Sequence, residues 1–143
     1  MLKGIDPLLD ADLLYVLAAM GHGDELALVD SNFPAASIAK RLIRLSGIDL
    51  VSAARAILTV FPLDTFVDSP VVRMEVVAAP LEIPEVQQEV FSACEQAEGR
   101  SLSMASLPRE AFYERARQAF AVVATSEMRP YGCLLLTKGV ITG

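Results

Sequence analysis

Residues 25–29, Glu-Leu-Ala-Leu-Val, contain four consecutive apolar residues that do not alternate with polar ones. A strand with one face in water shows alternation, whereas a strand covered on both faces is apolar throughout. This run therefore predicts a strand in a parallel or mixed sheet that lies between layers of helices. Three later segments, 69–80, 121–125 and 133–140, are also predicted strands, and the last two surround a predicted turn at Arg129 and Pro130.

Segments with the helical spacing of apolar residues alternate with these strands. The predicted helices lie within residues 10–20, 37–45, 49–61, 84–97 and 108–120. Asp10 or Asp12 can cap the first helix, Gly21 can end it, and Pro108 can begin the last one. The alternation predicts an α/β fold, and 143 residues suffice for a single compact domain with a mixed central sheet covered by helices.

The composition is 53% hydrophobic and only 21% charged, which excludes an intrinsically disordered chain. Because this apolar share is high for a small domain, we expect a homo-oligomer whose subunit contacts cover part of the apolar surface. The formal net charge is −6, and no basic stripe interleaved with aromatic residues occurs. A nucleic-acid partner is therefore not expected.

Cys94 and Cys133 are too few for a disulfide framework and lack metal-ligand spacing; Cys133 would be a nucleophile only if the fold brought it to a histidine. The first 20 residues carry three aspartates where a signal peptide is apolar, so a cytoplasmic protein is expected. The longest apolar stretch, residues 50–63, is interrupted by Arg55, and no membrane segment is expected. No phosphate-binding loop, dinucleotide-binding motif or metal-ligand cluster occurs, and no cofactor or metal is expected.

His22 is the only histidine and stands between Gly21 and Gly23, directly after the first predicted helix. A lone histidine is more often structural than catalytic. Here the glycines allow a tight exposed turn, and the helix end together with Asp24 or Asp30 would favour a protonated imidazole. His22 is therefore a candidate proton donor near neutral pH.

Three other residues are candidates for ligand binding, each with a structural alternative. Asp30 follows the strand at residues 25–29, where ligands gather in α/β sheets, but it could equally cap the next turn. Arg109 is either a solvated surface residue or a donor to sugar hydroxyls or a carboxylate. Tyr131 is either packed at a rim or a stacking platform. By themselves these residues indicate a small acid/base site without a cofactor.

Two separated regions carry a family resemblance. Residues 21–25 read GHGDE and residues 30–35 read DSNFPA; near the other end, residues 109–127 read REAFYERARQAFAVVATSE and residues 131–140 read YGCLLLTKGV. Over its whole length the chain resembles the RbsD/FucU family of sugar mutarotases. The first two motifs are more similar to the L-fucose mutarotase branch than to the D-ribose pyranase branch.

The resemblance implies roles for single residues. His22 matches the family's proton donor, whereas Asp30, Arg109 and the triplet Tyr131, Gly132 and Cys133 match substrate-binding positions. This chain departs from the family at Cys133, where asparagine is usual. Because a thiol is a weak donor and acceptor, a side-chain hydrogen bond to the sugar would be weakened or lost, which affects the choice of sugar.

The function that the resemblance implies is the interconversion of the α and β anomers of L-fucose or a related monosaccharide, by acid/base ring opening and reclosure without a cofactor. It also implies a ring-shaped homo-oligomer, commonly a decamer, in which a neighbouring subunit helps complete the site. Two alternatives stay open. One is a carbohydrate-binding accessory protein of a sugar transport system, and the other is a D-ribose pyranase.

Overall fold

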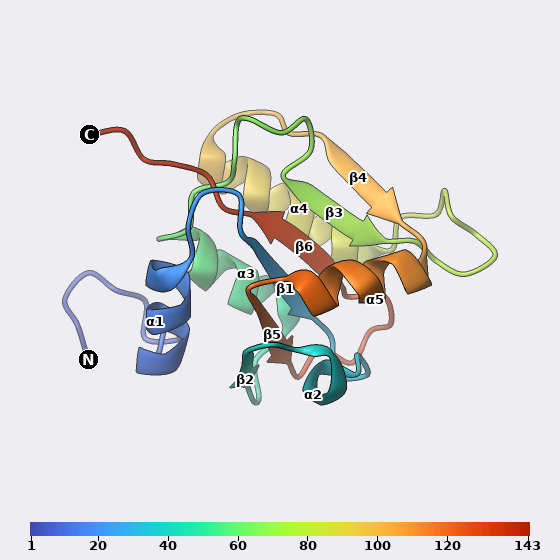
Figure 1. Ribbon diagram of the computed structural model, residues 1–143, viewed down its shortest axis with the longest axis horizontal. Coiled ribbons are helices and arrows are strands. Elements are labelled where there is room, and N and C mark those ends of the chain that lie inside the picture. Colours follow the sequence, from blue (N-terminus) through green and yellow to red (C-terminus); the bar gives the residue numbers. More distant parts are fainter.

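The chain folds around a six-stranded mixed sheet with the strand order β2-β5-β1-β6-β3-β4 (Figure 1). In this computed structural model, which describes residues 1–143, the strands are β1 (Glu25–Val29), β2 (Leu42–Leu45), β3 (Val71–Met74), β4 (Met104–Leu107), β5 (Ala121–Thr125) and β6 (Leu134–Thr137). β6 is antiparallel to both of its neighbours, and all other neighbouring strands are parallel. The predicted α/β fold with a mixed sheet is confirmed.

Helices cover both faces of this sheet. They are α1 (Ala11–Ala19), α2 (Ala35–Ile38), α3 (Leu50–Leu58), α4 (Glu85–Glu98) and α5 (Arg109–Gln118). Figure 1 shows α5 in front of the sheet, with α3 and α4 behind it. A cluster of 26 buried residues joins α1, α3 and α4 to one face, and a cluster of 14 joins α2 and α5 to the other. The sheet is therefore the middle of three layers.

The central strand β1 is covered on both faces, as its apolar run predicts. Leu26 and Leu28 belong to the larger cluster, Ala27 and Val29 belong to the smaller one, and all four side chains are completely buried. Successive side chains of a strand point to opposite faces, so only a strand between two helical layers buries both sets.

Short polar signals define where the predicted helices begin. The carboxylate of Asp10 accepts a hydrogen bond from the backbone N–H of Leu13 at 2.9 Å, and Asp49 accepts one from Ser52 at 2.8 Å. Each bond satisfies an N–H that has no partner within its helix. Pro108 directly precedes α5, as predicted. None of the five helices combines the length and the apolar character that a bilayer-spanning segment needs.

The predicted helix at residues 37–45 is wrong. α2 ends at Ile38, and Leu42–Leu45 is strand β2, which pairs in parallel with β5. Within β2, Ile43 and Leu45 are buried while Arg44 is exposed, which is the two-residue period of a strand. The backbone partners of β2 lie about 80 residues further along the chain, so local helical spacing could not reveal the pairing.

Four other features differ from the sequence-based expectations. Strand β4 was not predicted, and the strand predicted at residues 69–80 is limited to Val71–Met74. β5 and β6 are present, but they do not pair with each other because β1 lies between them. Gly21 does not end α1 in a left-handed conformation; Met20 is the C-cap and is extended, and the positive φ angle of 87° occurs at Gly23.

The parallel strands give the sheet two different edges. At the carboxyl edge, where β1 to β5 end and β6 begins, lie residues 30–34, residues 126–133 and the start of α5. At the amino edge, where β1 to β5 begin and β6 ends, lie residues 20–24, 62–70 and 138–140. The residues that the sequence analysis selected divide between these two edges.

Candidate functional site

His22 and Asp30 lie at opposite edges of the sheet. His22 precedes β1, and Asp30 follows it. The five residues of β1 alone extend about 16 Å at the usual rise of a strand. The two side chains therefore do not form one site within a single chain, and the other four substrate-binding candidates lie on the side of Asp30.

At the amino edge, the imidazole of His22 contacts two side chains from the segment before β3. Its Nε2 lies 2.9 Å from Oδ1 of Asp64, and its ring packs edge to face on Phe66 with 4.8 Å between ring centroids. The side chain of His22 is 40% exposed, whereas that of Asp64 is 2% exposed. A solvent-accessible imidazole is thus fixed by a buried carboxylate.

Asp64 is a carboxylate that the structure keeps ionised. Burial by itself would raise its pKa, but the hydrogen bond with His22, the backbone N–H groups of Phe66 and Thr65 and the charge of His22 together lower the pKa below its ordinary value. An ionised Asp64 requires the proton of neutral His22 to be on Nε2, which leaves Nδ1 to exchange protons. Asp64 was missed in the sequence, since 42 residues separate it from His22 and no local spacing joins them.

Asp30 is enclosed at the carboxyl edge. Its Oδ1 accepts hydrogen bonds from the backbone N–H groups of Asn32 and Phe33, both at 3.0 Å, which confirms that it caps the turn after β1. Its Oδ2 accepts one from the N–H of Gly132 at 3.0 Å and lies 3.6 Å from Sγ of Cys133. Burial raises the pKa of Asp30, and these hydrogen bonds partly oppose the shift. Asp30 therefore joins two turns at this edge.

Tyr131, Gly132 and Cys133 form the second of these turns. Tyr131 has a positive φ angle of 61°, and its hydroxyl accepts a hydrogen bond from the N–H of Val77 at 3.1 Å. A methyl group added to Gly132 would lie 3.3 Å from Cβ of Asp30, so this close approach favours glycine. Cys133 is buried, and desolvation raises the pKa of its thiol well above the ordinary value. Its sulfur contacts Asp30 rather than His22, and a thiolate nucleophile is not formed here.

Arg109 reaches the same edge from the first position of α5. Its guanidinium lies 3.1 Å from Oε1 of Glu110 and 5.7 Å from the ring centroid of Tyr113. The Tyr113 ring in turn packs at 5.3 Å on Phe33, which follows the turn capped by Asp30. Arg109 thus joins the Asp30 turn through two aromatic rings, and Tyr113 is a neighbour of the candidate site that the sequence did not reveal.

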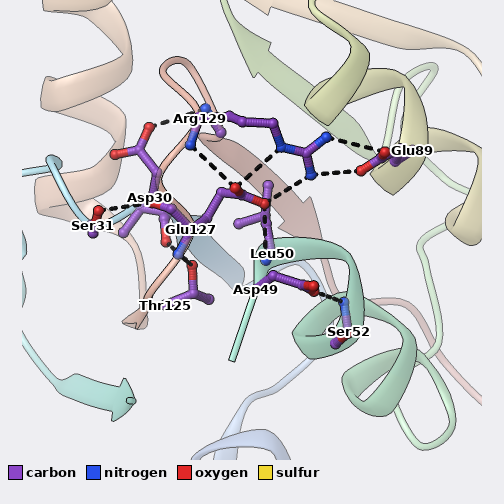
Figure 2. Close-up of polar contacts among 11 residues, drawn as sticks. Asp30, Ser31, Asp49, Leu50, Ser52, Glu89, Thr125, Glu127 and Arg129 are labelled. Carbon is purple, nitrogen blue, oxygen red and sulfur yellow. Dashed lines mark hydrogen bonds and ion pairs between the residues drawn. The ribbon is translucent and has the colours of Figure 1, made fainter. Parts of the chain in front are cut away.

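Glu127 stabilises the turns at the carboxyl edge through contacts of its side chain and of its backbone carbonyl. Figure 2 shows its carboxylate between Arg129 and the start of α3, and Arg129 continues to Glu89 of α4. The backbone carbonyl of Glu127 also accepts hydrogen bonds from the N–H and hydroxyl of Ser31, at 2.9 and 2.8 Å. Hydrogen bonds from Arg129 are the main reason that the pKa of Glu127 falls to about 2. The side chains of Glu127 and Arg129 therefore join this segment to α3 and α4, while the backbone carbonyl of Glu127 holds the turn after β1.

A polar hollow opens beside Asp30. It has a volume of about 190 Å³, and its lining includes Ser31, Arg44, Thr125 and Ser126 as well as Asp30. No group of three or more histidine, cysteine, aspartate or glutamate side chains is arranged to hold a metal ion. The amino edge therefore carries an imidazole able to exchange protons, and the carboxyl edge carries polar groups able to form hydrogen bonds.

Comparisons with known proteins identify the family of the chain. Residues 3–141 match the model of the RbsD / FucU transport protein family. An L-fucose mutarotase of Haemophilus influenzae (strain 86-028NP) is 44% identical over 140 residues, which are 98% of this chain and 97% of that protein. The crystal structure of the fucose mutarotase in complex with L-fucose from Streptococcus pneumoniae is 41% identical, covers 99% of this chain and 100% of its own, and has a TM-score of 0.91.

A more distant structure shares only the fold. RbsD of Bacillus subtilis, complexed with D-ribose, is 24% identical with a TM-score of 0.74, and the match covers 99% of this chain and all of that one. The similarity to the L-fucose branch is thus much closer than that to the ribose branch, as the motifs at residues 21–25 and 30–35 predict. The chain belongs to the RbsD/FucU family.

Proposed function

We propose that this protein is an L-fucose mutarotase, an isomerase that interconverts the α and β anomers of the free sugar. The observation that carries the proposal is the pair of His22 and Asp64: a half-exposed imidazole oriented by a buried carboxylate can both give and take a proton. The similarity over the full chain to L-fucose mutarotases supports fucose as the sugar. The single domain of residues 1–143 provides both halves of the site.

The reaction needs two proton movements. A proton is delivered to the ring oxygen while the proton of the anomeric hydroxyl passes to water, the bond between C1 and the ring oxygen breaks, and the open-chain aldehyde forms. Rotation about the C1–C2 bond and the reverse proton movements close the other anomer. His22 gives the proton from Nδ1, and the negative charge of Asp64 stabilises the imidazolium while it persists.

The carboxyl edge binds the sugar in this proposal. Arg109 and Tyr131 donate hydrogen bonds to sugar hydroxyls, and Asp30 uses the lone pairs that its backbone partners leave free. Gly132 and Cys133 contribute backbone groups. Because the Cys133 thiol is buried against Asp30, replacement of the family's usual asparagine removes a side-chain contact without exposing a new one.

The two edges meet between subunits. His22 of one subunit serves a sugar that is held at the carboxyl edge of a neighbouring subunit, since no single chain brings His22 to Asp30. Large apolar side chains stand exposed around the amino edge and α1, among them Phe66, Ile141, Leu2 and Tyr15, and subunit contacts would cover them. The assembly is a homo-oligomeric ring, a decamer by the resemblance to the family. A cytoplasmic location is part of the proposal and agrees with two free cysteines.

NMR saturation transfer between the α and β anomeric protons of L-fucose tests the function. Catalytic amounts of the protein should accelerate the transfer above a control without protein, and His22→Ala should abolish the acceleration while retaining sugar binding. Equal losses of binding and exchange would assign His22 to binding. If the wild-type protein binds fucose but does not accelerate exchange, it is a carbohydrate-binding accessory protein; acceleration with ribose alone would indicate a pyranase.

A further inference from the structure

We propose that Lys138 and Gly139, directly after β6, are positioning residues that set the contact between His22 and Asp64; the inference rests on the proposed function. The two members of the pair come from loops that are 42 residues apart in the sequence. Both loops are fastened to the same short segment, residues 137–139. The relative position of the imidazole and the carboxylate therefore depends on that segment.

Lys138 holds the end of α1, from which the His22 loop departs. Its Nζ donates hydrogen bonds to the carbonyl oxygens of Leu17 at 2.7 Å and Met20 at 2.6 Å. The last turn of α1 contains no basic residue of its own, so the ammonium group supplies the positive charge that a helix C-terminus favours. Lys138 thus fixes the chain two residues before His22.

The backbone of Lys138 holds the other side of the same loop. Its carbonyl accepts a hydrogen bond from the N–H of Gly23 at 2.9 Å, and its N–H donates to the carbonyl of Asp24 at 2.9 Å. His22 therefore lies between two attachment points on one residue, while its own side chain bonds only Asp64. Removal of the ammonium group would release one of these points and leave the backbone pairing in place.

The neighbouring residue fixes the Asp64 loop. The N–H of Gly139 donates to the carbonyl of Pro62 at 2.8 Å, and Thr137 accepts a hydrogen bond from the N–H of Asp64 at 3.0 Å. A methyl group on Gly139 would lie 2.7 Å from the carbonyl oxygen of Leu63 and 2.8 Å from Cα of Asp64, both backbone atoms. Any side chain at this position must displace the segment that carries the carboxylate.

Kinetics of Lys138→Met and Gly139→Ala in the intact oligomer test the proposal. We expect kcat for fucose exchange to fall about 10-fold in Lys138→Met and about 100-fold in Gly139→Ala, because a displacement near 1 Å in a catalytic group has effects of this size. KM should change less than about twofold, since the sugar binds at the other edge. Lys138→Arg should recover most of the activity because a guanidinium can still donate to two carbonyls.

Lys40 provides a matched control. Its Nζ donates to the carbonyl of Gln118, the last residue of α5, at 3.3 Å, so it also contacts a helix C-terminus but forms no hydrogen bond to the loops that carry His22 and Asp64. Lys40→Met should leave kcat unchanged. Because His22 is the only histidine, its ring resonances are unambiguous, and they should shift in Lys138→Met and not in Lys40→Met.

The outcomes separate this inference from the proposed function. Unchanged His22 resonances and unchanged kcat in folded Lys138→Met, or equal changes in kcat and KM, would overturn the positioning role even if the wild-type protein is an active mutarotase. If the wild-type protein does not catalyse exchange, the proposed function fails, and the ring resonances alone still decide whether Lys138 positions His22. If Lys138→Met does not fold, the same measurements on Gly139→Ala decide.

Discussion

The amino and carboxyl edges of the sheet differ in how they hold their polar groups. At the amino edge, His22 is 40% exposed and has one side-chain hydrogen bond. At the carboxyl edge, Asp30 is 3% exposed, and both of its oxygens have hydrogen-bond partners. A group that transfers protons must be accessible on one side, whereas a group that shapes a binding surface can be fully enclosed. In the function proposed above, the difference separates proton transfer from sugar binding within one small chain.

The largest expected effect comes from neutralising the carboxylate behind the imidazole. Asp64→Asn should lower kcat about 100-fold with little change in KM, because the imidazolium loses its buried counter-charge and its orientation. Steady-state exchange rates across a range of fucose concentrations provide both constants. Asp49→Asn, which changes a helix-capping residue at the surface, should behave as the wild-type protein. A rise in KM as large as the fall in kcat would assign Asp64 to sugar binding instead.

The next effect concerns the stability that Glu127 contributes at the carboxyl edge. The pKa of Glu127 is lowered to about 2 in the folded protein from an ordinary value of 4.5, so its stabilising contribution is complete above 4.5 and is lost as the pH falls toward 2. Between pH 6 and pH 3 this loss amounts to about 2 kcal/mol, or roughly 30-fold in the unfolding equilibrium. Urea unfolding of Glu127→Gln should lack this part of the pH dependence; identical pH profiles for both proteins would refute the assignment.

A smaller effect is expected from a methyl group at Gly132, in the turn formed by residues 131–133. Gly132→Ala places Cβ 3.3 Å from Cβ of Asp30 and from Cδ2 of Leu50, which requires these neighbours to move by a few tenths of an ångström. KM for fucose should rise about 10-fold, whereas kcat at saturating sugar should change little because His22 belongs to the other edge. Titration calorimetry with fucose gives an independent value for binding. A fall in kcat with unchanged affinity would contradict the division between the edges.

The smallest effect is expected at the outer end of the Glu127 network. Glu89→Gln removes the ion pair at 2.8 Å between Glu89 and Arg129, and both side chains are partly exposed. Exposed pairs of this kind contribute less than about 1 kcal/mol, and Arg129 keeps its bonds to Glu127. Thermal unfolding and KM should therefore stay close to wild type. A large rise in KM would show that Glu89 acts on the sugar site directly.

Local patterns in the sequence predicted the parts of the fold that local forces determine. The apolar run at residues 25–29 predicted a doubly covered strand, and Asp10 and Pro108 predicted helix starts. Strand β2 was missed because its partner is β5, far along the chain. The length of β1 also indicates that His22 and Asp30 lie apart within one chain, because the two ends of a five-residue strand cannot meet.

The candidate site was predictable to a similar extent. The two glycines beside the only histidine indicated His22 as a candidate, and the position directly after a predicted strand indicated Asp30. Asp64, Tyr113 and Glu127 were not found, because Asp64 contacts His22, Tyr113 contacts Phe33, and Glu127 contacts Ser31 and Leu50, all far apart in the sequence. The family resemblance provided the substrate-binding positions, which remain predictions until sugar binding is measured.

The most direct test of the account is complementation between two inactive variants. His22→Ala removes the amino-edge acid, and the double substitution of Arg109→Ala and Tyr131→Ala removes carboxyl-edge contacts, so each variant alone should not catalyse fucose exchange. When both are co-expressed and assemble together, random pairing places an intact amino edge against an intact carboxyl edge at about one interface in four. The account predicts recovery of about a quarter of wild-type activity. Mixed oligomers, verified by mass spectrometry, that stay inactive would contradict a site shared between subunits.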